Sequence, residues 1–170
     1  LETVEELFGD EVDQLSDKEK VLRIYDYILD NIRYSSVSFI QSGLIPQKAS
    51  DVIGAKQGDC KDVSTLFVAM CEAVGIKANL VLVNTRDNGE EDLALPSIRF
   101  NHCVAAVTID DKKYYVELTA ENLPFSTATY NLNNAFTLDI IPGQKDVRPQ
   151  LLDSPNWLEN KIIRTSNITF

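Results

Sequence analysis

The order of patterns along the chain limits its fold more than any other feature, because helical patterns come first and strand patterns follow. Residues 16–19 read Ser-Asp-Lys-Glu, which is the sequence of a helix capping box. Apolar residues then recur every three or four positions, so the sequence predicts a helix over 17–33. The apolar positions of this helix are Val21, Leu22, Tyr25, Ile28, Leu29 and Ile32.

A second helical pattern starts after Asp59, a good N-cap residue, and stops at Gly75, which suits the position just after a helix. The pattern places Cys60 in the first turn of this helix. Residues 34–57, between the two patterns, lack a sustained period and predict mostly loop, with 49–53 as a candidate helical turn. The apolar positions of the second helix are Val63, Leu66, Phe67, Met70 and Val74.

Segments typical of strands follow the second helix. Residues 77–85 are rich in Val and Leu and predict a strand. Residues 101–109 and 113–119 flank the polar run 110–112 and predict an antiparallel hairpin. One more strand is expected near 135–140. Helices followed by strands favour an α+β domain, in which the helices pack against one side of a largely antiparallel sheet.

The chain is short enough for one domain, and 170 residues can bury a substantial core. Its 44% hydrophobic and 25% charged residues are typical of a folded globular protein. We predict a domain over 1–150 and a C-terminal extension over 151–170, either a linker or the first strand toward a further domain. The β-prone run 162–170 supports the strand. Because the chain begins at Leu1, we expect a processed or excised part of a longer polypeptide.

The net charge of −10 argues against nucleic acids and anionic membranes as main partners, because both require a basic surface. The apolar runs 78–83 and 103–107 are far shorter than the roughly 20 residues that cross a bilayer, so membrane insertion is not expected. A peptide, a protein or a small molecule remains open as the substrate.

The three cysteines, Cys60, Cys71 and Cys103, are an odd number and contain no C-x-x-C pair. This pattern indicates neither a disulfide framework nor a tetrahedral zinc site. We therefore expect no cofactor, no metal and at least one free thiol.

Cys60 has a functional and a structural interpretation. At the start of a helix, free backbone N–H groups and the positive end of the helix dipole stabilise a thiolate, which is the nucleophilic form. The N–H of Cys60 is also suited to bind an oxyanion, because amides of a first helical turn have no acceptor within the helix. The alternative is a cysteine that packs in the core as a small hydrophobic residue.

His102 is the single histidine, so any imidazole base must be this residue. Strand alternation places it on the face opposite Cys103, which we expect to be a core residue. If the hairpin turns at 110–111, His102 pairs with Thr119, and Glu117 is its diagonal neighbour on the same face, roughly 7 Å away. The alternatives are a structural histidine and a solvated glutamate, and the sequence does not fix the register.

Three segments carry a resemblance to a known family: 58–62 (Gly-Asp-Cys-Lys-Asp), 100–102 (Phe-Asn-His) and 114–119 (Tyr-Tyr-Val-Glu-Leu-Thr). Together they resemble the bacterial transglutaminase-like domains of the papain-related superfamily. The resemblance implies a papain-like core and a thioester acyl-enzyme, with Cys60 as the nucleophile, His102 as the base and Glu117 as the acid that orients the imidazole. The acid is usually Asp in such domains, so Glu117 keeps the charge and adds a methylene.

The resemblance also implies a second oxyanion donor, taken from an upstream aromatic or amide side chain. Tyr34 and Gln41 are the candidates, and their alternatives are a tyrosine that caps the core and a solvated loop glutamine. The family includes calcium-dependent enzymes, but the acidic loop 87–92 lacks the ligand spacing of an EF-hand and is interpreted as solvated.

The leading hypothesis is an enzyme that acts on amide bonds of peptides or proteins through Cys60, His102 and Glu117. Hydrolysis rather than amine transfer, further domains in the same polypeptide and a periplasmic or extracytoplasmic location are expected by analogy with the family alone. The rival hypothesis is a binding or scaffold module that keeps the fold without turnover. A metal site at the same three residues is a weaker alternative, because they are not clustered in sequence.

Overall fold

The computed structural model describes residues 2–37, 43–89, 100–152 and 164–166. The helices are α1 (Glu2–Phe8), α2 (Asp17–Asn31), α4 (Ala49–Ala55) and α5 (Cys60–Ala73), with the short 3-10 helices η1 (Gly9–Gln14) and η2 (Arg86–Asn88). The strands are β1 (Arg33–Tyr34), β2 (Gln57–Gly58), β3 (Ala78–Asn84), β4 (His102–Ile109), β5 (Lys112–Val116), β6 (Phe136–Ile140) and β7 (Gln150–Leu151).

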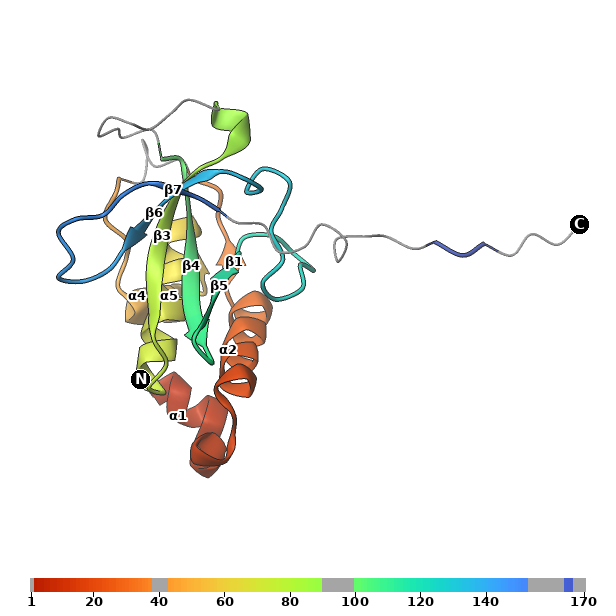
Figure 1. Cartoon of the computed structure of the whole chain (residues 1–170). Helices are drawn as coiled ribbons and strands as arrows, with labels where there is room; N and C mark the ends of the chain where they lie inside the picture. The colour runs from red at the N-terminus through yellow and green to blue at the C-terminus, as the bar shows by residue number, and fades with distance from the viewer. Residues whose placement is uncertain (1, 38–42, 90–99, 153–163, 167–170) are drawn as a thin grey trace, which may run out of the picture.

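An antiparallel sheet with the strand order β5-β4-β3-β6-β7 forms the centre of the molecule. Helices α2 and α5 lie on one face of it (Figure 1). Their buried side chains, such as Ile28 and Phe67, pack with Ala105 and Val107 of β4 in the main core. This is the α+β arrangement expected from the sequence.

The opposite face of the sheet is covered mainly by the irregular chain between β5 and β6. The second core on this face contains Val81, Val83, Val104, Ala106, Ala128, Leu132, Ala135 and Leu152. Strand β6 lies within the predicted range 135–140. The strand expected over 162–170 falls outside the described residues except for 164–166, which form neither helix nor strand.

The predicted capping box at the start of α2 is present, and Asp59 is the N-cap of α5 as predicted. The Ser16 side chain accepts a hydrogen bond from the Glu19 N–H, and the Glu19 carboxylate accepts one from the Ser16 N–H. Asp59 and Asp62 make the same reciprocal pair at the start of α5. At the other end of α5, Gly75 has a φ of +79°, a left-handed conformation that glycine adopts without strain. Local sequence therefore sets the ends of α5.

The first long helix ends two residues earlier than predicted. Arg33 and Tyr34 leave α2 and pair in parallel with Gln57 and Gly58, forming the small sheet of β1 and β2. The sequence analysis interpreted 34–57 mostly as loop, because a pairing between residues 24 positions apart leaves no local pattern. This pairing brings the end of α2 beside the residues that precede Cys60.

The hairpin of β4 and β5 turns where it was predicted to turn. Asp110 and Asp111 have φ values of 49° and 60°, the left-handed conformations of a two-residue type I′ turn, and Ile109 pairs with Lys112 across it. The register continues as far as Ala105 opposite Val116. Strand β5 ends there, so Glu117 and the residues after it are free to bend toward the start of β4.

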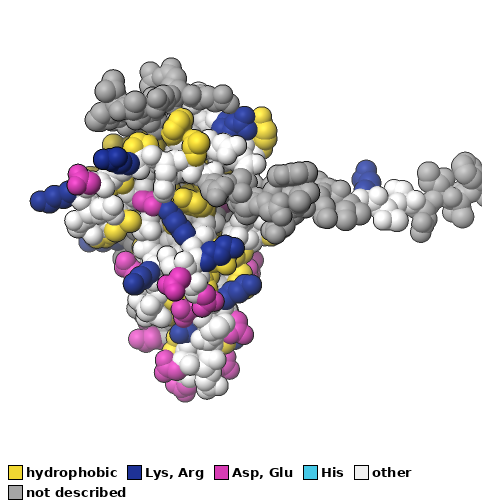
Figure 2. All heavy atoms as spheres, in the orientation of Figure 1, with side chains coloured by type: hydrophobic (Ala, Val, Ile, Leu, Met, Phe, Trp, Pro, Cys, Tyr) yellow, Lys and Arg dark blue, Asp and Glu magenta, His cyan; other side chains and the backbone are white. Residues whose placement is uncertain are grey.

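Acidic side chains gather over the helical end of the molecule, whereas lysines and arginines lie nearer the sheet (Figure 2). The helical end carries the exposed residues Glu2, Glu5, Asp10 and Glu11. In the described ranges no helix has the length and apolar character needed to cross a bilayer.

Candidate active site

Cys60 is the first residue of α5, as predicted. Its N-cap, Asp59, accepts hydrogen bonds from the backbone N–H groups of Lys61 and Asp62 at 3.1 and 3.3 Å. The Cys60 residue is only 3% exposed and packs with Cys103 in a small cluster. The partly buried members of this cluster are Tyr34, Leu80 and Leu82.

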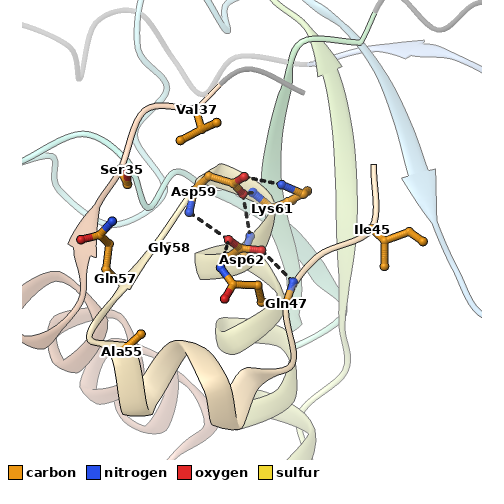
Figure 3. A pocket seen from close by; sticks show the side chains of 10 residues that line it. All are labelled: Ser35, Val37, Ile45, Gln47, Ala55, Gln57, Gly58, Asp59, Lys61 and Asp62. Carbon is orange, nitrogen blue, oxygen red and sulfur yellow. Dashed lines mark hydrogen bonds and ion pairs between the residues drawn. The ribbon is translucent and has the colours of Figure 1, made fainter. Parts of the chain in front are cut away.

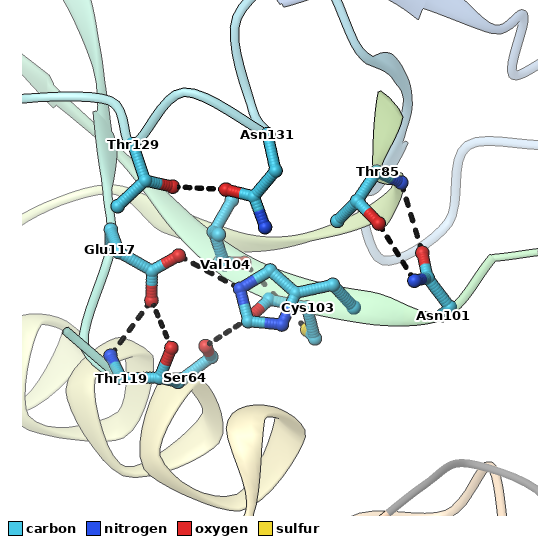
Figure 4. Close-up of polar contacts among 10 residues, drawn as sticks. Ser64, Thr85, Asn101, Cys103, Val104, Glu117, Thr119, Thr129 and Asn131 are labelled. Atoms are coloured by element: carbon cyan, nitrogen blue, oxygen red, sulfur yellow. Dashed lines mark hydrogen bonds and ion pairs between the residues drawn. The ribbon is translucent and has the colours of Figure 1, made fainter. Parts of the chain in front are cut away.

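His102 is the first residue of β4 and lies between two of the other candidates. Its Nε2 is 2.8 Å from Oε2 of Glu117, and Cys60 lies near enough to raise the pKa of its imidazole. The other carboxylate oxygen of Glu117 accepts hydrogen bonds from the N–H and the hydroxyl of Thr119, both at 2.7 Å (Figure 4). The structure thus brings together Cys60, His102 and Glu117, which are far apart in sequence.

The pKa values of His102 and Glu117 are shifted in opposite directions. Burial alone lowers the pKa of His102, but its hydrogen bonds with Cys60 and Glu117 and their charges raise it to about 10. Burial alone raises the pKa of the Glu117 carboxyl, but hydrogen bonds from His102 and Thr119 and the imidazole charge hold it below its usual value. Both shifts describe a protonated imidazole held beside a carboxylate.

Asn101 fixes the backbone just before His102. Its side chain accepts a hydrogen bond from the Thr85 N–H at 2.9 Å and donates one to the Thr85 hydroxyl at 2.7 Å, while its own N–H donates to the Val83 carbonyl at 3.0 Å (Figure 4). This clamp ties the start of β4 to the end of β3. Asn101 belongs to the Phe-Asn-His segment of the family resemblance, but its bonds to Thr85, 16 positions away, left no local signal in the sequence.

Charged residues on both sides of Cys60 form a buried network. The Lys61 ammonium pairs with the Asp59 carboxylate, and both residues are 4% exposed. The Asp62 carboxylate accepts hydrogen bonds from the N–H and the side chain of Gln47, both at 2.8 Å, and from the Asp59 N–H (Figure 3). These bonds hold the pKa of Asp62 below its usual value, although burial alone raises it.

Gly58 allows this network to be compact. A Cβ at position 58 would lie 2.8 Å from Cβ of Asp62, a contact that real side chains essentially never make. The α5 N-terminus can therefore approach β2 this closely only with glycine at this position.

The remaining candidates differ in placement. Tyr34 is half-buried beside Cys60, and burial raises the pKa of its phenol. Gln41 lies outside the described residues. Cys71 and Cys103 are buried, 0% and 1% exposed, and burial strongly raises the pKa of both thiols. Cys103 is thus a core residue, as expected.

A search of the described residues finds no group of three or more His, Cys, Asp or Glu side chains suited to a metal ion. In the acidic loop, residues 86–88 form η2, and 90–92 fall outside the described residues.

The sequence model described as the transglutaminase-like superfamily matches residues 6–119. No curated protein matches the chain. A "putative protease" from Parabacteroides distasonis has a similar structure, with a TM-score of 0.63 and 18% identity over 81% of this chain and 25% of that one. A structure named a TGase has a TM-score of 0.50 and 17% identity, and the match covers 76% of this chain and 34% of that one. A "putative cysteine protease" from Cytophaga hutchinsonii has a TM-score of 0.49 and 20% identity, and the match covers 91% of this chain and 51% of that one.

At these identities the likeness to the Parabacteroides protein and to the TGase concerns the fold alone, and it confirms the expected transglutaminase-like core. The chain spans between a quarter and about half of the length of the three structures. The family match covers more than half of the chain and includes Cys60, His102 and Glu117. The chain therefore belongs to the transglutaminase-like superfamily.

Proposed function

We propose that this chain is a cysteine-dependent amide-bond enzyme with Cys60, His102 and Glu117 as its catalytic triad. One observation carries the proposal: Nε2 of His102 lies 2.8 Å from the Glu117 carboxylate, and the same imidazole interacts with Cys60, the first residue of a helix, which raises its pKa. A buried carboxylate that fixes an imidazole next to a helix N-terminal thiol is the arrangement that activates a cysteine nucleophile.

In the proposed reaction, the Cys60 thiolate attacks the carbonyl carbon of an amide and forms a tetrahedral intermediate. The Cys60 N–H stabilises the oxyanion, since it belongs to the first turn of α5. Tyr34, packed beside Cys60, is the proposed second donor. Protonated His102 then gives its proton to the leaving amine, and a thioester remains on Cys60. Water, deprotonated by His102, releases the acid and restores the thiol.

Glu117 has the role of holding the imidazole in one orientation and stabilising its positive charge. A glutamate is long enough to place one oxygen on His102 while Thr119 binds the other. The additional methylene relative to aspartate is therefore compatible with a well-held imidazole.

We favour hydrolysis over amine transfer as the second half-reaction. Two of the similar structures carry names that refer to proteases, and a third is named a TGase. Acyl transfer from a glutamine peptide to an added amine that outpaced release of the free acid would reverse this preference.

The second candidate function is a binding or scaffold module without turnover. The observation that favours it is the 3% exposure of Cys60, since a buried thiol meets a substrate only after the surrounding chain moves. The two functions predict different chemistry at the same thiol.

The deciding experiment is the rate of iodoacetamide alkylation of each cysteine as a function of pH, mapped by mass spectrometry in the wild type and in His102→Ala. For an enzyme we expect labelling of Cys60 well below pH 8 that weakens in His102→Ala, because the imidazolium stabilises the thiolate. Cys71 and Cys103 are buried thiols and serve as internal controls. If the pH dependence of Cys60 alkylation is that of an ordinary thiol and does not change in His102→Ala, the scaffold module becomes the leading hypothesis.

A further inference from the structure

A pocket of about 500 Å³ opens beside the N-terminus of α5, between the chain after β1 and the chain before α4. Asp59 and Lys61, the two neighbours of Cys60, form part of its wall (Figure 3). The Cys60 side chain does not line the pocket and packs instead with Cys103 and Tyr34. The pocket therefore adjoins the proposed nucleophile through the backbone on both sides of it.

The polar groups of the pocket floor are already engaged within the protein. The Asp59 carboxylate pairs with Lys61 and caps α5, and the Asp62 carboxylate accepts three hydrogen bonds from Gln47 and Asp59. These carboxylates and the ammonium group already have partners, and two carboxylates face one ammonium, so the floor favours an uncharged ligand over an anionic one.

The rim of the pocket is apolar and exposed. Val37 is 36% exposed and Ile45 is 86% exposed, and Ala55 completes this apolar part of the lining. Leaving an isoleucine side chain in water rather than burying it is unfavourable. Exposed aliphatic side chains at the mouth of a pocket are typical of a surface that is covered when a ligand binds.

The segment that carries Ile45 is fixed to α5. Gln47 binds Asp62 through both its backbone N–H and its side-chain amide at 2.8 Å, so the rim and the start of the nucleophile helix are joined by two hydrogen bonds. An occupant held against Ile45 is thereby placed at a fixed distance from Cys60.

We propose that this pocket binds an uncharged apolar side chain of a polypeptide substrate, at a residue close to the amide bond that Cys60 attacks. The inference rests on the proposed function for the position of the reacting bond, while the binding of the side chain is independent of catalysis. Ile45 and Val37 are the residues that determine specificity, and the two carboxylates of the floor select against Asp and Glu side chains.

The test compares two peptidyl chloromethyl ketones that differ only in carrying Leu or Glu next to the electrophile. The rate of Cys60 alkylation by each probe is divided by the rate with iodoacetamide, which corrects for thiol reactivity. We expect the Leu probe to react about tenfold faster than the Glu probe in the wild type, since burial of one aliphatic side chain supports at least this ratio. We expect Ile45→Ser, which removes the aliphatic side chain without adding a charge, to move the ratio toward one.

Leu44→Ser is the matched control, because Leu44 is adjacent, 63% exposed and does not line the pocket. This variant should retain the wild-type ratio. Equal rates for both probes in the wild type, or the same loss of preference in both variants, would overturn the inference.

A second measurement separates this inference from the proposed function. In Cys60→Ala, acetyl-Gly-Leu-Gly amide should shift the methyl NMR signals of Val37 and Ile45 more than that of Leu44, and acetyl-Gly-Glu-Gly amide should not. If these shifts occur while Cys60 alkylates like an ordinary thiol, the pocket stands and the enzyme proposal fails. If Cys60 is activated but neither peptide shifts the methyl signals of Val37 or Ile45, the pocket inference is wrong and the enzyme proposal stands.

Discussion

The candidate site has two halves that are built in different ways. The helix half consists of Cys60 and its neighbours Asp59, Lys61 and Asp62, and the contacts that shape it mostly join residues at most three positions apart. The strand half consists of His102 and Glu117, which are 15 positions apart and meet because a hairpin has the correct register. The helix half depends on local chemistry, whereas the strand half depends on topology.

This difference implies that damage to the helix half appears mainly as lost stability, since its charges are buried and paired. Damage to the strand half should appear mainly as altered protonation of His102. The following predictions test that division.

The largest effect is expected for Lys61→Met. Removal of one partner from a buried ion pair leaves Asp59 with an uncompensated charge, so we predict a loss of about 3 kcal/mol in the free energy of unfolding. Urea denaturation followed by circular dichroism measures this loss. Lys18→Met, at an exposed position of α2, is the control and should change stability by less than about 0.5 kcal/mol. A comparable loss in both variants would show that the buried pair is not the cause.

The pH dependence of stability tests the strand half. The pKa of His102 is raised to about 10 in the folded chain, from about 6.5 when unfolded, so the imidazolium stabilises the fold fully below pH 6.5. This contribution is lost as the pH rises toward 10. We predict that the stability difference between the wild type and His102→Gln shrinks steadily from pH 6 to pH 10. A difference that stays constant or grows with pH would contradict the charged pair.

A smaller effect is expected for Thr119→Val. The variant keeps the shape of the side chain and removes the hydroxyl bond to Glu117, which should cost about 1.5 kcal/mol because the acceptor is charged. If Thr119 positions Glu117 for His102, the pH profile of Cys60 alkylation should also shift. Thr119→Ser should restore both properties. A loss of stability without any shift of the profile would assign Thr119 a structural role only.

The smallest effect is expected for Gln47→Ala. The side-chain bond to Asp62 is lost and the backbone bond remains, so we predict a loss of about 1 kcal/mol in unfolding free energy. The pH profile of Cys60 alkylation should not change, because Gln47 contacts neither Cys60 nor His102 by hydrogen bonds. Such a change in Gln47→Ala would show that the two halves are coupled.

The same division explains what the sequence predicts. The caps Ser16 and Asp59 and the stop at Gly75 are encoded within a few residues, so the start of α2 and both ends of α5 could be predicted closely. The hairpin could be predicted because its turn residues are adjacent. The sheet of β1 and β2 and the clamp between Asn101 and Thr85 could not, because each joins segments separated by 16 or more positions.

The candidate site residues show the same limit. Cys60 was identified from helix chemistry and His102 from being the single histidine. The distance between His102 and Glu117 required the register, which only the structure provides. Thr119 was seen merely as the strand partner of His102, and its two bonds to Glu117 form because β5 ends at Val116.

The turn at Asp110 and Asp111 has a consequence for how such a chain can change during evolution. It begins eight residues after His102, which is about 26 Å along an extended strand. Insertion or deletion of a single residue there would shift β5 by one position and turn Glu117 to the opposite face. The length of this distant surface turn is therefore under the same selection as the residues that meet at its far end, even though the turn touches none of them.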